Sequence, residues 1–173
     1  IHEGFATYAE GVYVEHLHGR DQADEFFDQQ RRFTHPKARL YRGHGTNSRQ
    51  AYNSAIYSKG ACVLNTLRHY VDDDEAWWNA LRTFNLAYRY DCASTEDFRA
   101  VLEAETERSW ERFFEQWVDG AGYPELRGSA HLAEGRITVE VSNPKVADTA
   151  FHVPLDLAWR VGEQWHTRRV MLE

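Results

Sequence analysis

Apolar residues in the first part of the chain recur at steps of three and four, which is the period of an α-helix. Over residues 2–18 the apolar stripe contains Phe5, Tyr8 and Val12. Gly19 follows directly, and glycine is a residue that commonly ends a helix. The pattern therefore predicts a first helix over residues 2–18.

The helical period continues to about residue 125 and is interrupted by residues that cap or break helices. The second predicted helix is capped by Asp21 and ended by Pro36, and the third covers residues 51–71. Asp72, Asp73 and Asp74 can cap the fourth helix. Two more helices are predicted over 95–105, where Ser94 or Thr95 is the cap, and over 107–118. Residues 35–50 are rich in turn-forming residues and are expected to be a loop.

The period changes from about four to two after the sequence G-A-G-Y-P at 120–124. Alternating apolar and polar residues then predict strands over 136–141, 152–159 and 164–172. We therefore expect a mainly α protein. Its helical domain covers residues 1–126, and a short antiparallel β segment follows over residues 127–173.

Composition excludes several classes of protein. Of the 173 residues 42% are hydrophobic and 14% aromatic, which is enough to form a core and argues against disorder. The formal net charge of −7 argues against a nucleic-acid partner, and no apolar run approaches the roughly 20 residues of a membrane span. Cys62 and Cys92 are the only cysteines, and a core of this size favours two free, partly buried thiols over a disulfide.

The first predicted helix begins with His2-Glu3, the dipeptide that opens the metalloprotease motif H-E-x-x-H. The second histidine of that motif is absent, because position 6 is Ala. On its position alone, Glu3 is consistent with a solvated carboxylate that the helix dipole stabilises. A metal site at Glu3 would need partners that this motif does not supply.

Two segments of the sequence resemble the aminopeptidase N family of gluzincin metallopeptidases. The stretch H-E-G-F-A-T-Y-A-E at 2–10 resembles the family's W-L-N-E-G-F-A segment, and Y-S-K-G at 57–60 resembles its Y-x-K-G motif. Later segments resemble the end of the family's helical catalytic lobe, and the residues after Gly128 resemble the start of a β-sandwich domain that follows it. The family's H-E-x-x-H motif would lie upstream of Ile1.

This resemblance implies a role for Glu3 as the third protein ligand of a catalytic Zn²⁺. Zinc in such peptidases takes three protein ligands and keeps one position for water. The two histidine ligands and the general base would belong to the upstream motif. Glu10 lies two helical turns after Glu3 and so shares its face. It is either an outer residue that orients a ligand histidine or an ordinary surface carboxylate.

The resemblance also implies that Tyr57 stabilises the oxyanion formed when zinc-bound water attacks a peptide carbonyl. The alternative is a core tyrosine, because Tyr57 also lies on the apolar stripe of its predicted helix. Tyr52 is a weaker candidate for lining the substrate pocket. Gly60 destabilises a helix relative to alanine, which suggests close packing against another backbone, whereas Lys59 is expected to be solvated.

The sequence thus predicts a part of a zinc aminopeptidase that hydrolyses N-terminal residues from peptides. The missing N-terminal part of the same catalytic domain would be its partner, and residues 1–173 alone would be inactive and prone to self-association. Two alternatives stay open. One is a non-catalytic peptide- or partner-binding protein of the same fold, and the other is a helical interaction module.

Overall fold

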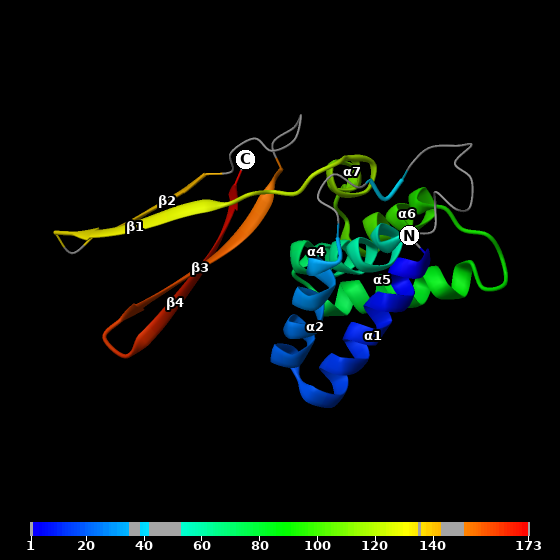
Figure 1. Cartoon of the computed structure of the whole chain (residues 1–173), viewed down its shortest axis with the longest axis horizontal. Coiled ribbons are helices and arrows are strands. Elements are labelled where there is room, and N and C mark those ends of the chain that lie inside the picture. The colour runs from blue at the N-terminus through cyan, green and yellow to red at the C-terminus, as the bar shows by residue number, and fades with distance from the viewer. Residues whose placement is uncertain (1, 35–38, 42–52, 135, 143–150, 173) are drawn as a thin grey trace. The chain divides into compact units, whose positions relative to one another are not determined.

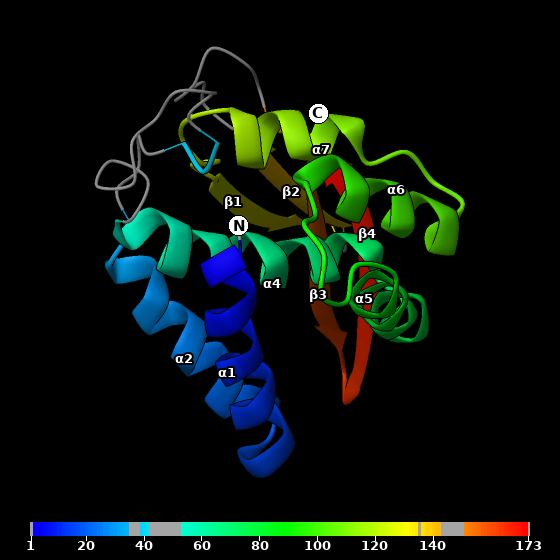
Figure 2. The same ribbon diagram turned by 90° about the vertical axis from the view of Figure 1, so that its right-hand side faces the viewer.

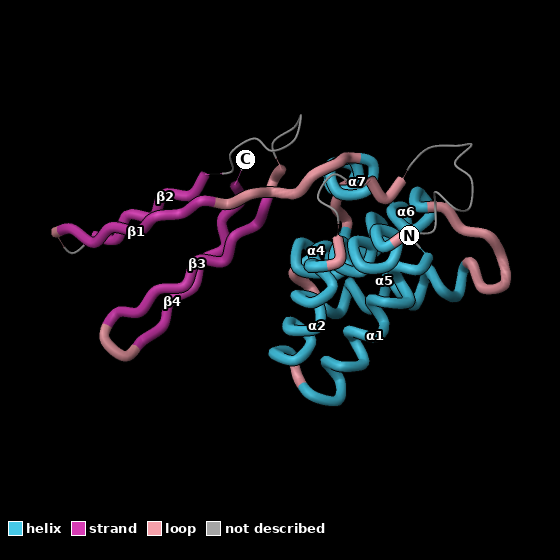
Figure 3. Tube along the Cα trace, viewed as in Figure 1, coloured by secondary structure: helices cyan, strands magenta, loops and turns pink. Residues whose placement is uncertain are grey.

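The computed structural model describes residues 2–34, 39–41, 53–134, 136–142 and 151–172. The chain divides into two compact units, Ile1–Ala121 and Gly122–Glu173. Figure 3 shows that the helices belong to the first unit and the strands to the second. The mainly α fold with short antiparallel strands at the C-terminus is confirmed. Tyr52 lies outside the described residues.

The first unit consists of α-helices and two π-helical turns, η1 and η2 (Figure 1). They are α1 (His2–His18), α2 (Arg20–Arg32), η1 (Ala55–Lys59), α4 (Gly60–Val71), α5 (Asp74–Ala87), α6 (Thr95–Thr106), α7 (Glu111–Phe114) and η2 (Glu115–Asp119). Helices α1 and α2 form an antiparallel pair, as Figure 2 shows. None of the described helices is both long and apolar enough to cross a membrane.

The helix starts follow local hydrogen-bonding chemistry. Asp73 caps α5 by accepting a hydrogen bond from the Ala76 amide at 3.0 Å. Ser94 caps α6 in a reciprocal arrangement with Asp97, as the sequence predicted for Ser94. The prediction for α2 was wrong: Gly19 is the N-cap, and Asp21 lies in the first turn.

The correction at α2 has a backbone cause. Gly19 has a φ of 87°, a left-handed conformation that glycine adopts without steric cost. The chain therefore reverses at a single residue, so α2 begins at Arg20, one residue before Asp21. Asp21 still contributes a negative charge near the N-terminus of α2, where the helix dipole favours it.

The core of the first unit is rich in aromatic rings. The largest fully buried side chains are Trp77, Phe98, Leu64, Leu67, Leu102 and Val118. Phe5, in the first turns of α1, packs against Phe84 and Phe98 with ring centroids 5.9 and 5.0 Å apart. The start of α1, which carries the first motif, is thereby anchored to α5 and α6.

The second unit contains two antiparallel hairpins. Its strands are β1 (Arg127–Ala133), β2 (Arg136–Ser142), β3 (Val153–Val161) and β4 (Gln164–Leu172). The three predicted strands are present as β2, β3 and β4. β1 itself was missed, because its sequence R-G-S-A-H-L-A lacks the β-branched and aromatic residues that mark strands.

The two cysteines are free. Cys62 on α4 is partly buried, as expected, and its thiol lies 3.7 Å from the carbonyl oxygen of Phe27. Burial raises the pKa of the Cys62 thiol to about 11. Cys92 is exposed, which differs from the expected partial burial, because it lies in the loop between α5 and α6.

Candidate functional site

The structure places the two motif residues on neighbouring elements of the helical unit. Glu3 lies in the first turn of α1 and is half-buried. Tyr57 is the central residue of η1, and 38% of its surface is exposed. The two residues are 54 positions apart in sequence, yet α1 packs directly against η1 and α4.

A glycine pair forms the contact between these elements. A Cβ atom at Gly4 would lie 2.8 Å from the Cα of Gly60 and 3.1 Å from the carbonyl oxygen of Ile56. A Cβ atom at Gly60 would lie 2.9 Å from the Cα of Gly4. Real Cβ atoms do not tolerate such distances, so the two backbones touch at this point. The close packing predicted for Gly60 is confirmed, and the residues adjacent to Gly4 and Ile56 are Glu3 and Tyr57.

Tyr57 belongs to a π-helical turn, a rare geometry that occurs frequently at functional sites. Side-chain hydrogen bonds hold this turn at both ends. The Ala55 amide donates to Asn53 Oδ1 at 2.9 Å, and the Ser58 hydroxyl donates to Gln30 Oε1 on α2 at 2.8 Å. The turn is thus fixed to α2 as well as to α1, and Tyr57 stays accessible to solvent.

Lys59 is buried, and the expectation that it is solvated was wrong. Only 7% of its surface is exposed. Burial disfavours the charged ammonium and lowers the pKa of Lys59 to about 8. Lys59 is buried because η1 packs against both α1 and α2. Tyr57, in the same turn, stays more exposed than Lys59.

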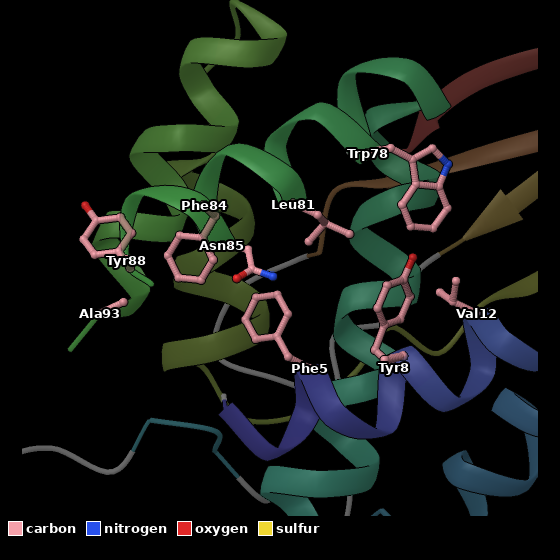
Figure 4. A pocket seen from close by; sticks show the side chains of 10 residues that line it. Phe5, Tyr8, Val12, Trp78, Leu81, Phe84, Asn85, Tyr88 and Ala93 are labelled. Carbon is pink, nitrogen blue, oxygen red and sulfur yellow. The ribbon is translucent and has the colours of Figure 1, made fainter. Parts of the chain in front are cut away.

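The two faces of α1 have different chemistry. An apolar hollow of about 430 Å³ opens between α1 and α5, and Figure 4 shows Phe5, Tyr8 and Val12 of α1 facing Leu81 and Phe84 of α5. At about 100° per residue, Glu3 and Glu10 project from the opposite side of α1. This hollow therefore belongs to the core packing and does not contain Glu3.

The acidic face of α1 is open to solvent. Glu10 is exposed, and Tyr13 and Leu17 on the same side expose 63% and 52% of their surface. Tyr13 and Leu17 are four residues apart and so lie one turn apart on α1. The face that carries Glu3 can therefore accept a further packed element.

The donor set for a metal ion is incomplete within the residues that the structure describes. Among them, no group of three or more histidine, cysteine, aspartate or glutamate side chains comes together. Glu3 contributes one carboxylate, half-buried in the first turn of α1. A tetrahedral zinc site on Glu3 needs further ligands from outside the described residues.

This unit also contains an ionic cluster that the sequence did not indicate. Arg68 on α4 exposes only 6% of its side chain and makes salt bridges with Glu15 on α1 and Asp74 on α5. Nearby, the Tyr8 hydroxyl accepts a hydrogen bond from the Trp77 indole at 2.9 Å, and burial raises the pKa of Tyr8 to about 12. In the sequence, Arg68 looks like an ordinary exposed residue of a helix. Only its pairing with Glu15, 53 positions away, identifies it as part of a buried cluster.

The chain is similar to known aminopeptidases in sequence and in structure. The family model described as Peptidase family M1 domain matches residues 1–117. Aminopeptidase M1 of Arabidopsis thaliana is 28% identical over 99 residues, covering 57% of this chain and 11% of that protein. Aminopeptidase M1-B of Oryza sativa subsp. japonica is 33% identical over 81 residues, covering 47% of this chain and 9% of that protein.

The fold also matches a solved structure. The crystal structure of Legionella pneumophila aminopeptidase A in complex with aspartic acid superimposes with a TM-score of 0.71 at 17% sequence identity. The match covers 98% of this chain and 20% of that chain. The aligned part thus spans about a tenth of the plant relatives and a fifth of the bacterial structure.

Proposed function

The chain belongs to peptidase family M1, and from this premise we propose that it is the part of a zinc aminopeptidase that supplies Glu3 and Tyr57 to the active site. The observation that carries the proposal is the backbone contact of Gly4 with Gly60 and Ile56. It brings the helix starts that carry the two motif residues together, although 54 positions separate those residues in sequence.

Glu3 is the residue of this chain that would hold the metal ion. The ion, when bound, supplies a Lewis acid and lowers the pKa of a water molecule. The H-E-x-x-H segment of the parent protein would provide the two histidine ligands and the general base. The exposed acidic face of α1 supports this arrangement, because it leaves room for a second ligand-bearing helix beside Glu3.

Tyr57 would donate a hydrogen bond to the oxygen that becomes negative when the peptide carbonyl is attacked. Its partial exposure and its place in a π-helical turn held by Ser58 and Asn53 support this role. A donor held in advance at this point stabilises the transition state more than the substrate. Tyr52 would line the substrate pocket, and Glu10 would orient a ligand histidine from the exposed face of α1.

The substrate of the parent would be the N-terminal residue of a peptide. The M1 family and the aminopeptidase names of the relatives support this class of substrate. The alternative, a protein of the same fold that binds peptides without cleaving them, predicts binding with no release of amino acids. The experiment below separates the two.

The full-length parent is the protein to test, with zinc content and hydrolysis of aminoacyl substrates as the two measurements. Wild type should contain one zinc per chain and release N-terminal residues, whereas Glu3→Ala should lose zinc and activity together. Glu25→Ala, which removes an exposed carboxylate of α2, is the matched control and should change neither. A Glu3→Ala protein that keeps its zinc and its activity would refute the proposed ligand.

A further inference from the structure

Arg68 joins three helices through one buried guanidinium group. Its Nη1 and Nη2 atoms donate to the Glu15 carboxylate on α1 at 2.6 and 3.2 Å. Its Nε and Nη2 atoms donate to the Asp74 carboxylate on α5, both at 2.8 Å. The group also lies over the Trp78 ring, 4.7 Å from its centroid. Such bidentate pairs fix direction as well as distance.

The charges of this cluster hold each other in their ionised forms. The hydrogen bonds between Arg68 and Asp74 lower the pKa of the Asp74 carboxyl and raise the pKa of the Arg68 guanidinium. Opposite shifts of this kind mean that each charge stabilises the other. Arg20 of α2 lies 3.4 Å from Glu15 at the exposed edge. Glu15 is the charged member of the cluster that belongs to α1, and its salt bridge with Arg68 connects that helix to α4.

The contact at the other end of the α1–α4 crossing has a different character. Gly4 meets Gly60 backbone to backbone, with no side chain of either residue between the helices. Helix packing fixes axial register by fitting side-chain ridges into grooves, and two glycines provide no ridge. The glycine pair therefore brings the helices close together but resists sliding only weakly.

The Gly4–Gly60 contact and the Glu15–Arg68 pair lie on the same two helical segments. Glu15 follows Glu3 by about three turns of α1. On the other side, η1 continues without a break into α4, so Arg68 and Tyr57 lie on one helical segment. A shift of α1 along α4 at Glu15 would move Glu3 past Tyr57 by a similar distance. Tyr8 of α1 lies at the same cluster: its hydroxyl accepts a hydrogen bond from Trp77 of α5 and interacts with the Arg68 guanidinium, whereas Glu15 supplies the carboxylate of α1.

We propose that Glu15 is a positioning residue, which sets the axial register of α1 on α4 through Arg68 and thereby the place of Glu3 relative to Tyr57. This inference rests on the proposed function and extends it to a residue far from the reacting atoms. Misplacement of a catalytic group by about 1 Å can lower a rate by roughly a hundredfold.

Glu15→Ala and Asp74→Ala in the full-length parent form a matched pair. Each removes one carboxylate from the same guanidinium, but Glu15 belongs to α1 and Asp74 belongs to α5. Both variants should lower the melting temperature, because each leaves the buried Arg68 with one carboxylate partner instead of two. Glu15→Ala should also weaken zinc binding in a chelator competition by about tenfold or more, because a shift of α1 displaces Glu3 and so misplaces a metal ligand. Its kcat should fall by at least about tenfold with KM little changed.

Asp74→Ala should keep its zinc affinity and kcat within about threefold of wild type, which supports the positioning role of Glu15. If Glu15→Ala does not accumulate as folded protein, Glu15→Gln and Asp74→Asn allow the same comparison with the side-chain shapes retained. An active, zinc-loaded wild type whose two variants lose zinc affinity and kcat to the same extent would overturn this inference alone. A wild-type parent without zinc or activity would overturn the proposed function, and the inference with it.

Discussion

Tyr57 and Lys59 lie two residues apart in the same π-helical turn and have opposite surroundings. Tyr57 keeps 38% of its surface exposed, whereas Lys59 keeps 7%. A hydroxyl that is to meet a substrate must be accessible, and a neighbouring ammonium that is buried is poorly placed to compete for it. The local packing thus favours Tyr57 as the reactive member of the motif.

Tyr57→Phe in the parent tests this assignment. If the hydroxyl donates only to the developing oxyanion, kcat should fall by roughly 10² to 10³ with KM little changed. Zinc content should stay at the wild-type level, because the phenol is not a ligand. Steady-state kinetics with metal analysis provide the measurement, and a variant within about threefold of wild-type kcat would indicate a structural tyrosine instead.

At the level of elements, helix caps and the backbone contact between α1 and α4 hold the unit in shape. The cap of α6 is the clearest local device. Asp97 Oδ2 accepts from the Ser94 amide at 2.7 Å and from the Ser94 hydroxyl at 2.8 Å. These bonds favour the ionised carboxylate and lower the pKa of Asp97. The stability that this cap contributes should therefore depend on pH.

Asp97→Asn tests that dependence. A pKa lowered on folding means that the stabilisation is present above the ordinary aspartate pKa of about 3.9 and is lost as the pH falls through the lower, folded value. Wild type should be the more stable protein at neutral pH, and the difference should shrink as the pH falls below about 4. Urea unfolding across this range measures it, and a difference that is independent of pH would contradict the assignment.

For the whole molecule, the proposed function implies a metal site that Glu3 would share with ligands of the parent protein outside residues 1–173. A single carboxylate cannot hold zinc tightly, so residues 1–173 expressed alone should bind no zinc stoichiometrically and should cleave no aminoacyl substrate. Equilibrium dialysis against submicromolar zinc is the measurement. Stoichiometric binding by this chain alone would show that its own residues complete the site.

The strands of the second unit lead to a prediction of how residues 1–173 behave in solution. Among the described residues each hairpin is a two-stranded sheet whose outer edges pair with no further strand, and Leu132, Trp165 and Met171 are largely exposed. Open edges beside exposed apolar side chains promote association. Light scattering on residues 1–173 should show a mass above that of a monomer that rises with concentration. A stable monomer at high concentration would contradict this expectation.

The sequence by itself determined the features that depend on nearest neighbours along the chain. The apolar periods placed α1 and three of the four strands, Ser94 marked the start of α6, and the motif around Glu3 and Tyr57 indicated the family. These features are local, because a helix period, a cap or a short motif needs only adjacent residues. β1 was missed since its residues have weak strand preference and its pairing with β2 decides its structure.

Only the tertiary structure decided which of the distant residues meet. It buried Lys59, joined Gly4 to Gly60 and enclosed Arg68 between Glu15 and Asp74. None of these outcomes follows from local sequence, because lysine and arginine on a helix are ordinarily solvated and a glycine does not specify its neighbour. Burial and ion pairing depend on the elements that pack from elsewhere in the chain, and that packing determines where Glu3 lies relative to Tyr57.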